Sequence, residues 1–346
     1  YFIKIVDKKI KFILDNPKLN SKFIFSKHND LNINCNTLTK NFYLDSYNYF
    51  PITEEFISFL EVFTWGEKFK YQNFYSESFK NNFKKNMNNF KSLSDVFVLG
   101  SSSSDNYYRN MITFLPRIFF TTEKKIKLVL HRNSSNKIRN FIRILCKRMN
   151  INVQFIFLDD NFYKFYNSQI PQFLKKTDSI KILNTLKNLK TFNISEKNKI
   201  YISRQNCFYR NLINEGDVIE KLKKLNFKIV DLNNVEILQQ IKMFSNADVV
   251  VSPSGSALTN LVFCNEGTKV FEISPKYNFK YEDPFKFRYQ TISQTLKLNY
   301  KRIEADSISV KTINERVNNT IMSKAIKESN YYKDLIIKLD KIDEIN

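Results

Sequence analysis

Glycine is scarce in this sequence, with 5 residues among 346, whereas Lys, Asn, Ile and Phe are abundant. This joint bias is typical of a low-GC coding background, which raises the Lys and Asn content throughout a chain. The formal net charge of +21 would otherwise favour a polyanionic partner, either nucleic acid or an anionic membrane surface. The Lys residues are scattered, and no helix-turn-helix, zinc-finger or RNA-binding signature is present. We therefore expect a solvated basic surface and no nucleic-acid partner, with a basic nucleic-acid-binding protein kept as the alternative.

Cysteine and histidine are also rare, with 4 and 2 residues. The cysteines form no close pair and no metal-ligand spacing, which predicts reduced thiols in an intracellular protein. They are Cys35, Cys146, Cys207 and Cys264. No Asp-x-Asp motif occurs, and the two histidines lie far apart in sequence, so no metal ligands are visible. We expect neither a metal nor a cofactor.

Long apolar runs are missing as well. No stretch of about 18 apolar residues occurs, so nothing in the sequence is expected to span a membrane. This predicts a cytoplasmic protein, and the basic surface would suit peripheral contact with an anionic membrane. The chain begins at Tyr1 without Met, so the alternative that a leader or anchor ahead of Tyr1 was removed stays open.

What is present is enough apolar material for real cores: 42% hydrophobic residues, with 15% aromatic. A chain of this length is one large or two medium domains. In the first half, buried strands alternate with helices in a β-α-β rhythm typical of a Rossmann-like unit. The expected strands are 95–100, 125–131 and 152–158. The expected helices begin at Asp105, as an N-cap, and at Asn136.

The β-α-β rhythm restarts after a polar, Lys-rich break at 171–198. Strands are expected at 200–203 and 227–230, with helices at 215–225 and 235–244. We therefore predict an α/β protein with two doubly wound, Rossmann-like domains facing a cleft, the GT-B architecture. The predicted divisions are 1–190, of which 1–45 is a poorly defined lead-in, then 191–300, and a helical segment over 301–346 that packs back.

The most informative segment is 246–275. It predicts a buried strand to Ser252, a tight loop at 253–255, a helix from about Ser256 to Cys264, a Gly267 turn and a second strand. The first turn of such a helix leaves backbone N–H groups without partners, and they can bind a phosphate. The alternative is an ordinary strand-helix connection. We define the phosphate cradle as the loop and this helix. Its candidate donor-binding residues are Ser254, Gly255, Ser256, Thr259 and Asn260.

Four residues outside the cradle add to the candidate donor site, namely Ser203, Arg204, Arg210 and Glu272. Arg204 follows Ser203 at the end of a predicted strand, where a guanidinium can grip a diphosphate at two points. Arg210 could supply a second positive charge. Glu272, on the strand after the cradle, could take ribose hydroxyls. Asn214 and Glu215 are interpreted as residues that order the loop at the start of the next helix.

Three motifs in this order resemble glycosyltransferase family 61, over roughly residues 95–275. The first is Asp105-Asn-Tyr-Tyr-Arg-Asn-Met-Ile-Thr-Phe-Leu-Pro-Arg117. The second is Tyr201-Ile-Ser-Arg204, followed by Arg210 and Asn214-Glu215. The third is Ser254-Gly-Ser-Ala-Leu-Thr-Asn260, preceded by the Gln-x-x-x-Phe-x-x-Ala-Asp pattern of 240–248. The resemblance implies a GT-B enzyme that transfers a sugar from a nucleotide sugar with inversion, and that binds this donor in its C-terminal half.

The sequence departs from the family pattern at three positions. Arg109 and Ser254 stand where the family has histidines, and Thr113 stands where it has an aspartate. Inverting transfer needs a base near the acceptor hydroxyl, and Asp105 is the nearest remaining carboxylate, although its place as a helix N-cap also explains it. Asp105 and Arg109 are thus the catalytic candidates. Arg109 could bind an acidic acceptor or an acidic donor sugar.

We expect a metal-independent glycosyltransferase whose partners are a nucleotide sugar and a glycan acceptor, either a surface polysaccharide or a lipid-linked oligosaccharide. Two further alternatives are a catalytically impaired protein that binds nucleotide or glycan, and a related transferase such as a polysaccharide pyruvyltransferase.

Overall fold

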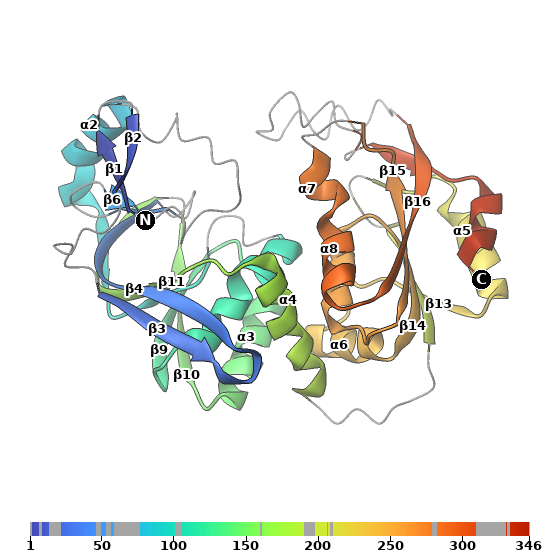
Figure 1. Cartoon of the computed structure of the whole chain (residues 1–346), viewed down its shortest axis with the longest axis horizontal. Coiled ribbons are helices and arrows are strands. Elements are labelled where there is room, and N and C mark those ends of the chain that lie inside the picture. Colours follow the sequence, from blue (N-terminus) through green and yellow to red (C-terminus); the bar gives the residue numbers. More distant parts are fainter. Residues whose placement is uncertain are drawn as a thin grey trace. The chain divides into compact units, whose positions relative to one another are not determined.

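The computed structural model describes most of the chain (Figure 1). The described residues are 2–6, 9–13, 22–45, 50–52, 57–58, 77–100, 106–159, 161–189, 198–205, 207, 210–278, 282–308, 330 and 333–345. The chain divides into unit 1, Tyr1–Ser179, and unit 2, Ile180–Asn346. Each unit has its own central sheet. Along the sequence, the division between the units falls within helix α4 (Lys176–Thr185), ahead of the boundary expected at 190/191 and inside the expected 171–198 break.

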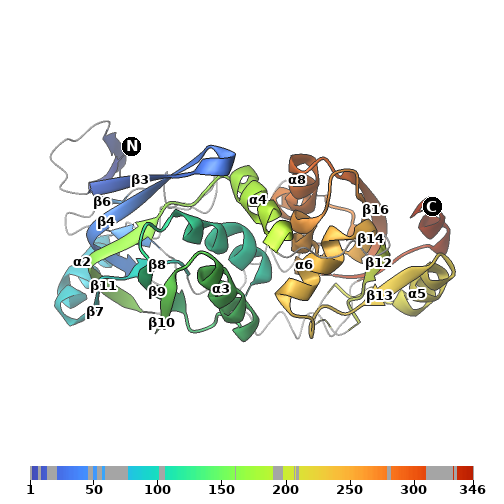
Figure 2. The ribbon, with the colours of Figure 1, turned by 90° about the horizontal axis from the view of Figure 1, so that it is seen from below.

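Unit 1 contains the predicted β-α-β rhythm. Strands β8 (Phe97–Val98), β9 (Lys125–His131) and β10 (Asn152–Leu158) lie parallel and adjacent. Helix α3 (Asn136–Arg148) joins β9 to β10 and begins after Ser135, whose hydroxyl accepts a hydrogen bond from the Ile138 N–H (3.3 Å). Its buried side chains recur at helical spacing, which explains why the sequence predicted it. Figure 2 shows α3 beside β9 and β10.

Beyond β8 the unit 1 sheet is mixed, because the next strand is parallel to β8 and the two strands after it pair antiparallel. Strand β11 (Phe162–Pro171) pairs with β4 (Ile33–Asp45), which pairs with β3 (Lys22–His28), and the sheet order is β10-β9-β8-β11-β4-β3. Unit 1 also contains β1 (Phe2–Val6), β2 (Lys9–Ile13), β5 (Phe50–Ile52), β6 (Ile57–Ser58), α2 (Glu77–Asn86) and β7 (Lys91–Ser94).

Two neighbouring strands of this sheet are interrupted at the same level. Asp95, between β7 and β8, and Asn167, within β11, both have positive φ angles, 56° and 44°. The Asn167 amide donates to the Asp95 carboxylate (2.6 Å), and the register of β11 against β4 shifts between Phe165 and Ser168. The register shift marks a β-bulge in β11, which re-aims the residues on either side of it, and Asp95 separates β7 from β8 beside that bulge. Tyr163 and Leu158 share one apolar core in this unit.

Unit 2 is built on one sheet of order β13-β12-β14-β15-β16-β17. Its first five strands are parallel, and β17 is antiparallel to β16. The strands are β12 (Asn198–Ile202), β13 (Phe227–Val230), β14 (Ala247–Pro253), β15 (Lys269–Pro275), β16 (Asn299–Ile308) and β17 (Asp334–Ile336). The chain runs outward from β12 to β13 and then returns to the other side of β12. The strand order thus reverses between β12 and β14, which makes a topological switch point.

Helices cover both faces of the unit 2 sheet (Figure 1). Helix α5 (Glu215–Lys224) and the 3₁₀ helix η11 (Leu339–Ile345) pack on one face, where Val218, Leu222 and Ile342 share a core with the strands. The other face carries α6 (Ile237–Ser245), α8 (Arg288–Thr295) and the 3₁₀ helix η8 (Ser256–Phe263), with the short α7 (Asp283–Lys286) leading into α8. The doubly wound prediction fits this unit.

The C-terminal segment differs from the helical segment expected over 301–346. Residues 301–308 belong to strand β16, in which Ile303 and Ala305 are buried and their neighbours are more exposed. This alternation suits a strand with one face on a core. The segment later forms β17 and the 3₁₀ helix η11, while residues 309–329, 331–332 and 346 lie outside the described residues. Among the residues that the structure describes, no helix is both long and apolar enough to cross a bilayer.

Candidate functional site

The loops that follow β12 and β14 meet at the switch point of unit 2. Arg204 lies two residues after β12, and Gly255 lies two residues after β14. The Arg204 side chain crosses directly over Gly255: a β-carbon at position 255 would overlap Nη1 of Arg204 and would lie 2.9 Å from its Cζ. Only glycine leaves room for this approach. The close approach explains why Gly255 stands in the cradle loop, and it places the Arg204 side chain directly against the cradle.

Arg204 is held at both its backbone and its side chain. Its N–H donates to Oε1 of Glu215 (2.9 Å), which also accepts from the Tyr201 hydroxyl (2.9 Å). Its Nε donates to the Arg210 carbonyl (3.3 Å). Burial and the Glu215 charge raise the pKa of Tyr201 well above its usual value, so this phenol stays protonated. Glu215 therefore orders the loop, as the sequence predicted.

The chain between Arg210 and Asn214 is anchored to the C-terminal segment. Asn214 forms two hydrogen bonds with Ile337, donating from Nδ2 to its carbonyl (2.8 Å) and accepting at Oδ1 from its N–H (3.2 Å). The Asn211 N–H donates to the Asp334 carboxylate (2.9 Å). Arg210, at the start of this anchored stretch, has a φ of 58° and a buried side chain. These contacts with residues more than a hundred positions away fix the second cation of the site.

The predicted donor-binding residues lie at three depths. Ser203 and Ser256 are half-buried at the edge of the sheet. Arg204 and Arg210 are 7% and 4% exposed. The remaining candidates are fully buried, namely Ser254, Thr259, Asn260 and Glu272. An anion approaching the carboxyl edge of the sheet would meet the two half-buried serines, the arginines behind them and the first turn of η8, whose N–H groups lack intrahelical partners.

Asn260 points into the protein rather than toward the open edge of the sheet. Its Nδ2 donates to Oε1 of Gln240 on α6 (2.7 Å) and to the Ala257 carbonyl (3.0 Å). Gln240 in turn donates to the Val235 carbonyl (2.6 Å) at the start of α6. The Gln240–Asn260 pair thus links η8 to α6. In this structure Asn260 shapes the cradle from behind.

Glu272 is likewise buried within the sheet, where it lies opposite Arg302 on β16. The Tyr300 hydroxyl donates to its carboxylate. Burial raises the pKa of Glu272, and the Ser254 and Tyr300 hydroxyls and the charges of Arg302 and Arg210 oppose that rise. Cradle residue Ser254 and the cation of Arg210 act on this carboxylate from within the protein, and its contact with ribose hydroxyls stays a prediction.

The catalytic candidates belong to unit 1. Asp105 lies outside the described residues. Arg109 is exposed and begins the π-helix η5 (Arg109–Phe114). Its N–H donates to Oδ1 of Asn106 (3.1 Å), and the Asn106 carbonyl accepts from the N–H of Asn110 (3.0 Å). The Asn106 side chain therefore caps this turn, and the N-cap that the sequence predicted at Asp105 lies outside the described residues.

Arg117, the last residue of the first motif, received no role from the sequence. It is fully buried in the 3₁₀ helix η6 (Leu115–Phe120). Its guanidinium donates to the carbonyls of Pro171 (2.8 Å) and Leu99, and lies over the Phe173 ring (4.7 Å). It ties the helix to the ends of two strands. The two carbonyl partners are 54 and 18 residues away in sequence. The one hint in the sequence is that this arginine is surrounded by apolar residues of the motif.

In the described part of the chain, no group of three or more His, Cys, Asp or Glu side chains could hold a metal ion. The positive charge at the switch point comes from arginines.

Comparison with known proteins identifies one family. A family model described as Glycosyltransferase 61 matches residues 97–271, about half of the chain, from β8 to β15. The match spans all three motifs. No curated protein matches the chain.

Proposed function

The chain belongs to glycosyltransferase family 61, and we propose that it transfers a sugar, with inversion and without a metal, from a nucleotide sugar to a glycan acceptor. We further propose a GT-B arrangement in which unit 2 binds the donor and unit 1 binds the acceptor. The acceptor is a surface polysaccharide or a lipid-linked oligosaccharide. The protein acts in the cytoplasm, in peripheral contact with an anionic membrane.

The observation that carries this proposal is the Arg204 guanidinium lying across Gly255 at the switch point. In open α/β sheets, ligands bind at the carboxyl ends of the strands where the strand order reverses. A guanidinium can hold two phosphate oxygens at once. It also stabilises the negative charge that develops on the departing nucleoside diphosphate. We therefore assign leaving-group stabilisation to Arg204.

Arg210 supports the same role from a buried position. Its backbone carbonyl accepts from Arg204, and its charge acts on Glu272. A second cation here would attract the negative charges of a diphosphate, and this attraction is strong in the low-dielectric interior. Ser203 and Ser256, at the half-buried edge, would offer hydroxyls to the phosphates. Thr259, Asn260 and Glu272 would support the cradle from inside the fold.

Inverting transfer also requires a base for the acceptor hydroxyl. A guanidinium stays protonated, so Arg109 would orient an acidic group while a carboxylate removes the proton. Asp105 stays our candidate for this base. Both residues belong to the first motif, and we place them on the acceptor side of the reaction.

The proposal is tested by following release of the nucleotide from UDP-, GDP- and CMP-sugars in the presence of EDTA and a panel of oligosaccharide and lipid-linked acceptors. One donor should turn over with the wild type. Arg204→Ala should lower kcat by about 100-fold or more, as expected when a charge that stabilises the leaving group is removed. Lys223→Ala, an exposed change on α5, should turn over normally. Full turnover by Arg204→Ala would contradict the proposal, and nucleotide binding without turnover would favour the catalytically impaired alternative.

A further inference from the structure

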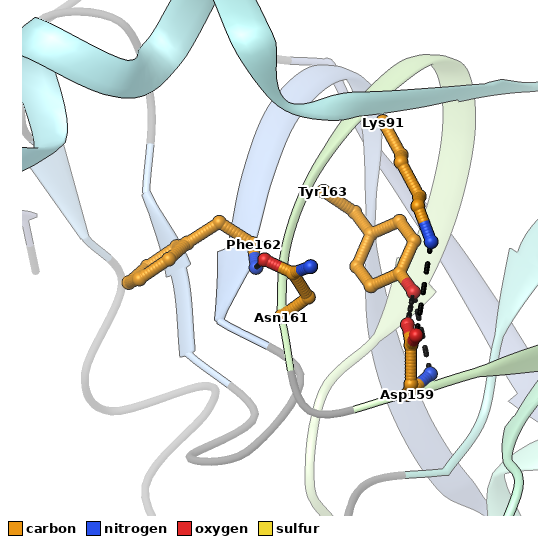
Figure 3. Close-up of polar contacts among 5 residues, drawn as sticks. All are labelled: Lys91, Asp159, Asn161, Phe162 and Tyr163. Carbon is orange, nitrogen blue, oxygen red and sulfur yellow. Dashed lines mark hydrogen bonds and ion pairs between the residues drawn. The ribbon is translucent and has the colours of Figure 1, made fainter.

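Unit 1 contains a cavity of about 570 Å³ just beyond the ends of β9 and β10. Arg132 follows β9, Asp159 follows β10, and Lys91 comes from β7 on another wall. Figure 3 shows Lys91 and Tyr163 pointing toward the Asp159 carboxylate. Three charged side chains and a phenol from four strands or their ends thus converge on one space. This is the pattern of a ligand site, a cavity with a few polar groups placed on a rigid framework.

The Asp159 carboxylate is held in place by Tyr163. The Tyr163 hydroxyl donates to Oδ1 of Asp159 and accepts from the Asp159 N–H (3.2 Å), so the two residues close a small ring. Tyr163 itself is 4% exposed, packed in the core of unit 1. Next to them, Oδ1 of Asn161 accepts from the Phe162 N–H (2.9 Å) and shapes the start of β11 (Figure 3). The carboxylate therefore has a fixed direction.

This carboxylate stays ionised and reaches solvent. The Tyr163 hydrogen bond, helped by the charges of Lys91 and Arg132, lowers the pKa of Asp159. Burial and the neighbouring carboxylate raise the pKa of Tyr163 to about 12, so its hydroxyl remains a donor. The Asp159 side chain is 38% exposed. Asp159 is consequently a permanent hydrogen-bond acceptor at the cavity surface.

Cationic donors stand next to this acceptor. Lys91 Nζ lies 3.7 Å from Oδ2 of Asp159, beyond ordinary hydrogen-bond distance, and its side chain is 64% exposed. Arg132 is exposed and close enough to act on both Asp159 and Tyr163. A hydroxyl group both donates and accepts. Neighbouring hydroxyls on one ring could thus donate to the carboxylate and accept from the two cations.

The walls between these polar groups are apolar. Ile156 and Leu158 line the cavity, and the Phe157 ring beside them is 43% exposed. The Arg139 guanidinium covers this ring at 4.2 Å from its centroid and holds it in position. A sugar ring presents hydroxyls at its edge and C–H groups on its faces, which matches a cavity with both kinds of wall. We propose that the cavity formed by Lys91, Arg132, Asp159 and Tyr163 binds a sugar ring through neighbouring hydroxyls.

The role of this site rests on the proposed function: in a glycosyltransferase, a sugar on unit 1 belongs to the acceptor. A second cavity in unit 1, of about 400 Å³, offers a contrast. Its polar side chains pair with one another, Asp95 with Asn167 (2.6 Å) and Glu123 with Gln169 (2.7 Å). It also lies at the amino ends of β8 and β9, away from the edge where α/β proteins bind ligands.

The test is saturation-transfer NMR of the full chain with a panel of methyl glycosides covering common hexoses, N-acetylhexosamines, 6-deoxyhexoses and hexuronic acids. At least one glycoside should bind the wild type. Asp159→Asn should weaken its binding by about tenfold or more, because the charged acceptor is lost. Tyr163→Phe keeps the packed ring and should weaken binding less. Glu123→Gln, in the contrasting cavity, is the matched control and should bind as the wild type does.

Melting curves of each variant separate loss of binding from loss of folding. The proposal is overturned if no glycoside binds the folded wild type, or if folded Asp159→Asn binds as tightly as Glu123→Gln. Titration of the same samples with UDP, GDP and CMP keeps the two proposals apart. Glycoside binding without nucleotide binding would leave the sugar site standing and remove the donor site, and the reverse result would remove only the sugar site.

Discussion

The guanidinium of Arg204 occupies the space that a side chain at position 255 would fill. The two residues are 51 positions apart in sequence, in loops that follow adjacent strands of the unit 2 sheet. Gly255→Ala should push the guanidinium aside, because the clash involves the far end of a flexible side chain. We expect nucleotide affinity to fall by about tenfold or more, since a charged hydrogen bond contributes about 1.5–3 kcal/mol.

Thermal melting and nucleotide titration of Gly255→Ala should diverge, with a small change in stability and a large loss of binding. Gly216→Ala is the matched control. Gly216 lies in α5, and a β-carbon there meets nothing within 4 Å. This change should leave binding intact and stabilise the protein by about 0.5–1 kcal/mol. Equal nucleotide affinity in the two variants would show that the Arg204–Gly255 contact has no part in binding.

The sequence predicted unit 2 better than unit 1, for a physical reason. Parallel strands such as β14 are buried on both faces and read as short Val-rich runs. Strands β4 and β11 instead mix Asn, Lys and Tyr with apolar residues. Their pairing joins residues more than a hundred positions apart, which local periodicity does not reveal. The α/β class was therefore predictable, whereas the mixed sheet of unit 1 was not.

The candidate site shows the same limit at the level of single residues. Arg204 and the cradle loop were predicted because each follows a strand whose position was clear. The inward direction of Asn260 depends on Gln240 of another helix, and the burial of Glu272 depends on β16 beside it. Arg117 was missed because its carbonyl partners come from distant strand ends. The residues that follow a strand can be predicted from the local sequence, but the hydrogen-bond partners of a side chain cannot, because they come from distant segments.

Cys207 should report on the donor site, because its N–H donates to the Arg204 carbonyl (3.0 Å) and its side chain is half-buried. The other cysteines are buried, and burial raises the pKa of Cys35 and of Cys146 to about 11. A thiol reagent should therefore modify Cys207 first. The bound nucleotide should slow that fast phase, and Cys207→Ser should abolish it. A fast phase that persists in Cys207→Ser would assign it to another thiol.

Glu272 should make unit 2 less stable as the pH rises. Its pKa lies above the ordinary value of 4.5 because burial disfavours the charged form. The folded state therefore binds this proton more tightly than the unfolded state does. The stability that this proton contributes is fully present below the ordinary pKa of 4.5, and it is lost as the pH rises through the raised pKa of the folded state. Glu272→Gln removes this titration.

Denaturant midpoints of the wild type and Glu272→Gln should be compared between about pH 4.5 and pH 8. The wild type should lose stability relative to the variant across this range. A difference between the two proteins that stays constant with pH would mean that the Glu272 pKa is the same in the folded and unfolded states.

Arg117 should be essential to the stability of unit 1. Arg117→Ala leaves the Leu99 and Pro171 carbonyls without this donor and opens a cavity beside Phe173, which should cost about 3 kcal/mol or more. Arg117→Lys should recover little, because an ammonium lacks the planar fork that reaches both carbonyls. Arg143→Ala, an exposed change on α3, should stay within about 0.5 kcal/mol. Urea unfolding measures the free energy of unfolding of all three variants. A mild effect of Arg117→Ala would contradict the role of Arg117 in holding the two strand ends together.

The most direct test of the donor site is calorimetric titration of the wild type, Arg204→Lys and Lys223→Ala with UDP, GDP and CMP in EDTA. The account predicts that one nucleotide binds the wild type and Lys223→Ala equally. Arg204→Lys should bind it at least about tenfold more weakly, because an ammonium cannot hold two phosphate oxygens in the geometry of a guanidinium. Binding of no nucleotide by the wild type, or equal binding by Arg204→Lys, would contradict the assignment of the switch point as the donor site.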